Sequence, residues 1–265
     1  MNEMSEPSVC IPKMLPEDLW ESAADIAIGI NPLNRPALEW LPQTDPEFRP
    51  TKQRLAAVTG RIWHNSGVHL TVGFLDDPPA DLRARILSHM NAWSKTANVR
   101  FVETDNDPEV RIARTPGDGF WSYLGTAILS IDPDEPTMNL DSFTMDTPES
   151  EFHRVVRHET GHTMGFPHEH MRGELVNRID PKKAIKFFEE TQGWTEEEVR
   201  QQVLTPLEES SLFGTIHDDQ NSIMCYQIPA FLTKDHQPII GGIDIDQSDF
   251  EFAAKVYPKP VQPPV

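Results

Sequence analysis

Four histidines fall within the stretch HETGHTMGFPHEH at 158–170, although the chain of 265 residues has only ten. Residues four apart on a helix share a face, so His158 and His162 point the same way. Gly165 lets the chain leave the helix in a conformation that is costly for other residues, and His168 can then return as a third ligand. Imidazole nitrogen suits Zn²⁺, and a catalytic zinc usually has three protein ligands and a position for water. The spacing predicts one catalytic zinc ion.

Glu159 lies beside the first predicted ligand. A carboxylate there can accept a proton from a water on the zinc and pass it to a leaving amine, so we interpret Glu159 as the general base of a hydrolase. The full pattern H-E-x-x-H-x-x-G-x-x-H is much stricter than H-E-x-x-H, and roughly one chain in 10⁴ would carry it by chance. The alternative is a structural histidine cluster.

A helix must position these residues. Thr147 is a candidate N-cap, Pro148 fits the first helical position, and Glu149 and Glu151 favour the positive end of the helix dipole. The helix is predicted to continue through FHRVVRHETGH.

Patterns elsewhere predict an α+β fold, with a mixed sheet, two long helices above a cleft and a more irregular C-terminal part below. Alternating and apolar stretches predict strands, namely VHLTVGF (68–74), VRFVE (99–103), EVRIAR (109–114), TAILSI (126–131) and, at an edge, PTMNL (136–140). Helical spacing and caps predict further helices at 16–29, from Asp81 to Ala97, from Asp180 to Gly193, after the capping-box pattern TEEE (195–198) and at 246–256.

The length fits one large domain, or a domain of about 200 residues with an extension. Residues 1–60 are interpreted as an N-terminal extension that can act as a pro-segment, 61–258 as the catalytic domain and 259–265 as a proline-rich tail.

The formal net charge of −19 disfavours nucleic acid and anionic membranes as partners, and no apolar run is long enough to span a bilayer. Two cysteines cannot form a disulfide framework.

A second motif, NSIMCY, follows the histidines by about sixty residues. Together, HETGHTMGFPHE and SIMCY resemble the astacin-like branch of the metzincin zinc peptidases, as do RIWHNSGVHLTVGF and WSKTANVRFVE. The resemblance covers about residues 61–258 and implies a metzincin-like fold and a metalloprotease that cleaves protein or peptide substrates. It further implies that Met224 forms the methionine turn beneath the zinc site.

The resemblance also assigns residue roles. Tyr226 would stabilise the oxyanion and serve as a possible fifth zinc ligand, and Glu169 would pair with a new N-terminus after removal of a pro-segment. TMNL would be the edge strand along which a peptide lies antiparallel. The chain departs from animal astacins because their four cysteines and the F-x-G-D latch are missing, and Cys225 replaces a usual histidine. The combination HEH and the missing disulfides resemble microbial relatives more than animal digestive or matrix enzymes.

Cys10 offers a different latch, since thiolate is a strong zinc ligand that can take the place of water. A surface thiol or a packing cysteine is the alternative. Two other functions stay open at this point: a zinc hydrolase of a non-peptide amide, and a catalytically silent zinc-binding interaction module. No secretory signal peptide is visible, although the family is usually secreted, so the localisation is left open.

Overall fold

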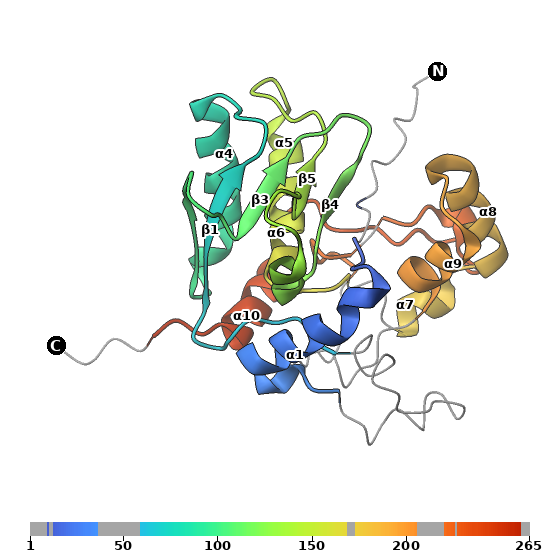
Figure 1. Ribbon diagram of the computed structural model, residues 1–265. Helices are drawn as coiled ribbons and strands as arrows, with labels where there is room; N and C mark the ends of the chain where they lie inside the picture. Colours follow the sequence, from blue (N-terminus) through green and yellow to red (C-terminus); the bar gives the residue numbers. More distant parts are fainter. Residues whose placement is uncertain are drawn as a thin grey trace.

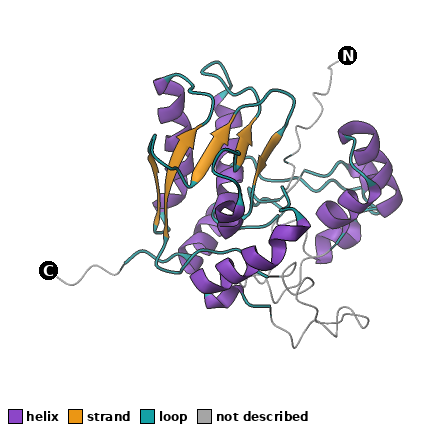
Figure 2. Ribbon diagram, in the orientation of Figure 1, coloured by secondary structure: helices purple, strands orange, loops and turns teal. Residues whose placement is uncertain are grey.

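A five-stranded mixed sheet forms the centre of the molecule (Figures 1 and 2). The computed structural model describes residues 10, 13–36, 59–168, 173–205, 220–225 and 227–260. The strand order is β2-β1-β3-β5-β4. The strands are β1 (Val68–Phe74), β2 (Val99–Glu103), β3 (Val110–Ala113), β4 (Phe120–Ser122) and β5 (Met138–Leu140).

The sheet is parallel except at one edge. β1 pairs in parallel with β2 and β3, and β3 pairs in parallel with β5. All four residues of β3 are buried, as expected for a strand covered on both faces. β4 runs antiparallel to β5 and forms the edge. The prediction that PTMNL lies at the edge is therefore wrong, because the short strand β4, which the sequence analysis missed, pairs with its outer side.

Helices pack on one face of this sheet. In Figure 1, α4 and the helix that carries α5 and α6 both lie behind the strands. The described α-helices are α1 (Trp20–Ile30), α4 (Ala80–Met90), α5 (Glu149–Glu151), α6 (Arg157–Thr163), α7 (Gly173–Arg178), α8 (Pro181–Gln192), α9 (Glu196–Val199) and α10 (Gln247–Val256). Short 3-10 helices are η1 (Glu17–Leu19), η2 (Pro32–Asn34), η3 (Asn91–Lys95), η4 (Gly125–Ser130) and η8 (Ala230–Leu232), and π-helical turns are η5 (Phe152–Val156) and η7 (Arg200–Leu204).

Several local predictions need correction. TAILSI is not a strand but the 3-10 helix η4, since short apolar runs do not distinguish the two by periodicity. The helix at α5 starts after Pro148 without a side-chain cap, so Thr147 is not its N-cap. Likewise α4 follows Pro79, and Asp81 instead accepts a hydrogen bond from the backbone of Leu82.

Two residues after α1 attach it to the start of the predicted catalytic domain. The Asn31 amide donates to the carbonyl of Trp63 at 2.8 Å. The Asn34 amide donates to the carbonyl of Ile62 at 2.8 Å and accepts from the Ile62 N–H at 3.0 Å. Both asparagines are buried, so α1 is fixed to this region although it lies within residues 1–60. The boundary at residue 60 stays a prediction.

A separate small core lies beside the sheet domain, under α7, α8 and α9 (Figure 1). The predicted helix from Asp180 to Gly193 is confirmed as α8. The Asp180 side chain accepts from the N–H groups of Lys182 and Lys183, and Gly193 ends the helix at a φ of 67°. None of the described helices combines the length and hydropathy that crossing a membrane requires.

Candidate metal centre

The helix that carries the first two histidines is continuous from α5 through η5 to α6, with one π-helical turn at Phe152–Val156. Tryptophans fix its C-terminal half from two sides. The indole N–H of Trp93 donates to the carbonyl of Arg157 at 2.9 Å, and that of Trp63 donates to the carbonyl of Thr163 at 2.9 Å. These contacts set the height and rotation at which α6 presents its side chains.

Three histidine side chains converge at the end of this helix. The Nε2 atom of His168 lies 3.1 Å from that of His158 and 3.0 Å from that of His162. The turn between them is made by Gly165, with a φ of 96°, and a Cβ there would lie 2.9 Å from the carbonyl oxygen of Arg61. Glycine is therefore favoured at this position both by the backbone conformation and by the lack of space for a side chain, as predicted.

Backbone carbonyls fix the tautomers of two of these histidines. Nδ1 of His158 lies 2.6 Å from the carbonyl oxygen of Ile223, and Nδ1 of His162 lies 2.8 Å from that of Phe166. A carbonyl only accepts, so each Nδ1 carries the proton. Each Nε2 is thereby left with its lone pair directed at the other imidazoles. Burial lowers the pKa of His158 to about 4, so protonation of its Nε2 is unfavourable at neutral pH.

This arrangement fits a zinc ion. Ligand nitrogens about 2.0–2.1 Å from a tetrahedral zinc are about 3.3 Å apart, close to the separations found here. The carbonyl partners at Nδ1 are the usual supports that orient metal-bound histidines. The donor set and its surroundings thus match the chemistry of the predicted ion.

Glu159 is fully buried beside the histidines. Apart from a contact with the Cys10 thiol, its carboxylate oxygens have no hydrogen-bond partner within the part of the chain that the structure describes. Burial raises its pKa to about 8, and the Cys10 thiol and Arg154 oppose that shift. A dication at the histidines would also favour the charged form.

The fourth member of the cluster is Cys10. Its sulfur and one ring nitrogen from each of His158, His162 and His168 all lie within 4.8 Å of one another, and all four residues are buried. Neither Cys10 nor Cys225 is in a disulfide. Of the alternatives for Cys10, the surface thiol is therefore wrong.

Met224 packs against the helix between its two histidines. A Cβ on Gly161 would lie 2.4 Å from the Met224 sulfur, so the glycine at this position makes room for the thioether. No pattern in the sequence around Gly161 signals this role, because Met224 is distant in the chain. Tyr226 and Glu169, the other two predicted site residues, lie outside the described residues.

Asp249 on α10 holds the turn that contains Met224. Its carboxylate accepts from the Ser222 hydroxyl at 2.6 Å and from the Ile223 N–H at 2.9 Å, and Ser222 in turn accepts from the Met224 N–H. Asp249 also completes a capping box with Asp246, so the pattern DQSD was the available sequence signal.

We expect Asp249 to make stability pH-dependent. Burial raises its pKa to about 6, from an unfolded value near 3.8. A raised carboxyl pKa stabilises the fold fully below the unfolded pKa, and this contribution of about 3 kcal/mol is lost as pH rises through 6. In denaturant unfolding, Asp249→Asn should therefore gain stability relative to the unsubstituted chain between pH 4 and 7. A difference between the two proteins that is constant with pH would contradict the assignment.

A second group of side chains that could bind a metal lies where α4 faces α5 and η5, and consists of His89, Glu149 and His153. Two arginine side chains already bind to members of this group. Nε of Arg157 donates to Nδ1 of His89 at 3.3 Å, and Arg85 pairs with Glu149 at 2.6 Å. Because Nδ1 of His89 accepts a hydrogen bond, Nε2 carries its proton and faces Glu149 at 3.2 Å rather than a metal. This cluster is a charged network between helices.

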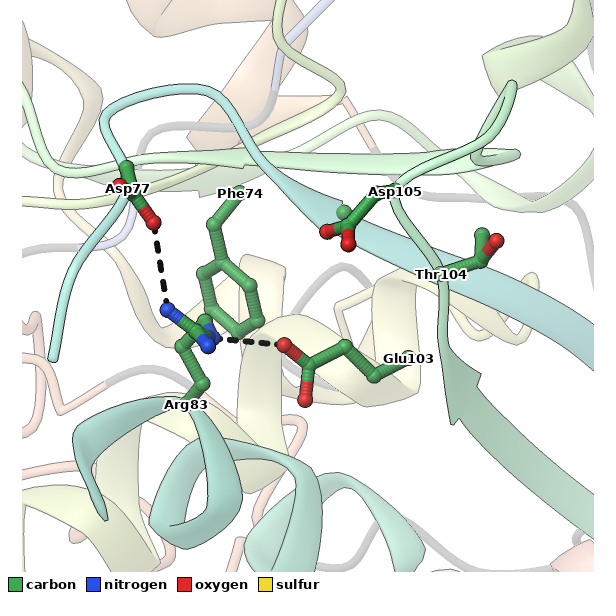
Figure 3. A pocket seen from close by; sticks show the side chains of 7 residues that line it. Phe74, Asp77, Arg83, Glu103, Thr104 and Asp105 are labelled. Carbon is green, nitrogen blue, oxygen red and sulfur yellow. Dashed lines mark hydrogen bonds and ion pairs between the residues drawn. The ribbon is translucent and has the colours of Figure 1, made fainter. Parts of the chain in front are cut away.

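Figure 3 shows a small surface hollow whose lining includes no residue of the histidine cluster. Arg83 reaches into it and pairs with Asp77 at 3.2 Å and Glu103 at 2.6 Å. Its other lining residues are Gly73, Phe74, Thr104 and Asp105. No predicted site residue lines it.

Comparison with known proteins agrees with the geometry. A family model described as Astacin, a family of peptidases, matches residues 57–250. Zinc metalloproteinase nas-27 of Caenorhabditis elegans is 27% identical over 170 residues, which are 61% of this chain and 34% of that protein. The chain thus spans about a third of the length of this curated relative.

Solved structures give the same fold. A structure of myroilysin is 29% identical with a TM-score of 0.70, covering 76% of this chain and 97% of that one. The high choriolytic enzyme 1 of the medaka Oryzias latipes, a hatching enzyme, shares the fold at 18% identity and a TM-score of 0.51, over 77% of this chain and 96% of its own. The predicted α+β, metzincin-like fold is confirmed, and the chain belongs to the astacin family of peptidases.

Proposed function

We propose that the protein is a zinc-dependent endopeptidase whose ligands are His158, His162 and His168. The observation that carries this proposal is the convergence of three Nε2 atoms, with the tautomers of His158 and His162 fixed by carbonyl groups. Membership of a peptidase family supports peptide bonds as the substrate, ahead of a non-peptide amide or a role in binding alone.

Each role in the proposed reaction is assigned to a residue of the chain. A bound zinc polarises the scissile carbonyl and lowers the pKa of water. Glu159, buried and with few competing hydrogen bonds, would accept the proton of the attacking water and deliver it to the leaving amine. Met224 would support the histidines from below, as its packing on Gly161 suggests. Tyr226 stays the candidate for stabilising the oxyanion, and Glu169 for pairing with a new N-terminus.

Cys10 would keep this site latent. Its sulfur lies among the three histidines, so as a thiolate it would be a fourth protein ligand and would take the position that water needs. Cys10 also belongs to the small core under α7, α8 and α9, as the packing-cysteine alternative expects, and the observation that favours the latch is the position of its sulfur among the imidazole nitrogens. Latency through Cys10 rests on the same three ligands as the proposed activity.

Metal analysis and peptide hydrolysis test the function. We expect one zinc per purified chain, and its removal by a chelator should lower the melting temperature, because the ion cross-links α6 to the following turn and to Cys10. In the Cys10→Ser chain, which lacks the proposed latch, the same removal should abolish cleavage of a mixed peptide library. His162→Ala should lose the zinc, whereas His69→Ala, a change at an exposed histidine on β1, should keep it. Active protein that contains no zinc would contradict the proposal.

A further inference from the structure

Two residues of the N-terminal segment, Cys10 and Lys13, lie at the edge of the sheet. Cys10 forms a parallel β-bridge with Phe120, and Lys13 forms one with Tyr123. β4 is the edge strand, and exposed sheet edges bind extended peptides through main-chain hydrogen bonds. With the sulfur of Cys10 among the histidines, the segment lies where a substrate along this edge would lie.

Lys13 marks a side-chain position on that edge. Its Nζ lies 4.4 Å from the centroid of the Trp121 ring on β4. The indole N–H of Trp121 donates to Oδ2 of Asp118 at 2.9 Å. The face of an indole ring is negative and attracts cations, and the exposed carboxylate adds negative charge beside it.

The ring is held in place independently of Lys13. Tyr123 packs against Trp121 edge to face, with ring centroids 5.8 Å apart. Together with the hydrogen bond to Asp118, this contact fixes the plane of the indole. The position is therefore a property of β4 and its turn, and it would receive a side chain from a peptide running in either direction.

We propose that Trp121 and Asp118 form a subsite for a lysine or arginine side chain of the substrate, which Lys13 fills in the latent chain. This inference rests on the proposed peptidase function. Cys10 pairs with Phe120, and Lys13 pairs with Tyr123 three residues further along β4, while three residues of an extended substrate span about 10 Å. The subsite thus belongs to the third residue from the scissile bond, on one side of it.

Peptide pairs test the subsite in the full-length chain with Cys10→Ser and Lys13→Gln, which removes both competing side chains. A peptide library first identifies a cleaved sequence. Variants of that peptide then carry lysine, arginine, norleucine or glutamate at the third residue on either side of the bond. On one side, kcat/KM should favour lysine and arginine over norleucine by about 3- to 10-fold, a cation–π effect of a solvent-exposed cation on the face of a buried indole.

Substitutions test whether the preference for lysine and arginine depends on Trp121 and Asp118. Trp121→Leu should bring the lysine-to-norleucine ratio close to 1, and Trp121→Phe and Asp118→Asn should each lower it. Glu190→Gln, an equal change of charge on the exposed side of α8, should leave it unaltered. A ratio near 1 before any change at Trp121, or one that persists in Trp121→Leu, overturns the subsite while leaving the peptidase intact. Cleavage of no peptide at all overturns the proposed function itself, and the subsite with it.

Discussion

Replacing Cys10 with serine should activate the full-length protein at least 10-fold in peptide hydrolysis. The neutral serine hydroxyl is a weak zinc ligand, so water regains the position that the thiolate would fill. Initial rates on the same peptide, measured for the two proteins at equal zinc content, check the prediction.

The matched control for this change is Cys225→Ser. Cys225 is also buried, but it does not belong to the metal-binding cluster of the described residues, so its replacement should bring no activation. Cobalt substitution gives a readout that does not depend on turnover, because a thiolate ligand produces charge-transfer absorption that Cys10→Ser must lack. Equal activity in the unsubstituted chain and Cys10→Ser, with identical cobalt spectra, would dismiss the latch.

Glu159→Gln, made in the Cys10→Ser background, should lower kcat by about 10²- to 10⁴-fold and keep one zinc ion per chain. The amide has the shape of the carboxyl group but cannot accept the proton. Because the carboxylate is buried with few hydrogen bonds, the neutral amide should not weaken the fold.

A second glutamate on the same helix provides the comparison. Glu151 pairs with Arg154 at 2.6 Å and is only partly buried, so Glu151→Gln should hydrolyse peptides at the rate of its parent. If Glu159→Gln retained that rate as well, the general-base assignment would be wrong.

The metal-binding motif is predictable because it is local. His158 and His162 are placed by helix geometry alone, and the positive φ of Gly165 follows from the need to return His168 within three residues. The capped helix α8 is predictable for the same reason, since Asp180 and Gly193 act within one turn of its ends. These features need no knowledge of the rest of the chain.

Features that depend on distant partners were missed. β4 has only three residues, and it becomes a strand because β5 pairs with it, a fact that no pattern within Phe120–Ser122 contains. Cys10 was a candidate latch only because thiolate binds zinc, and the sequence left a surface thiol and a packing cysteine as alternatives, because only the tertiary fold brings its sulfur to the histidines. Lys13 and Trp121 meet for the same reason, through bridges between segments far apart in the chain.

The attachment of α1 determines how strongly the N-terminal segment can compete with substrate. Asn31 and Asn34 anchor the helix to residues 62–63, and only a few residues separate Lys13 from its first turn. Cys10 is therefore tethered near the metal centre at an effective concentration on the order of millimolar. Latency of the intact chain should not depend on its dilution, whereas a cut between Lys13 and α1 would turn the same segment into a separate peptide that dilution removes.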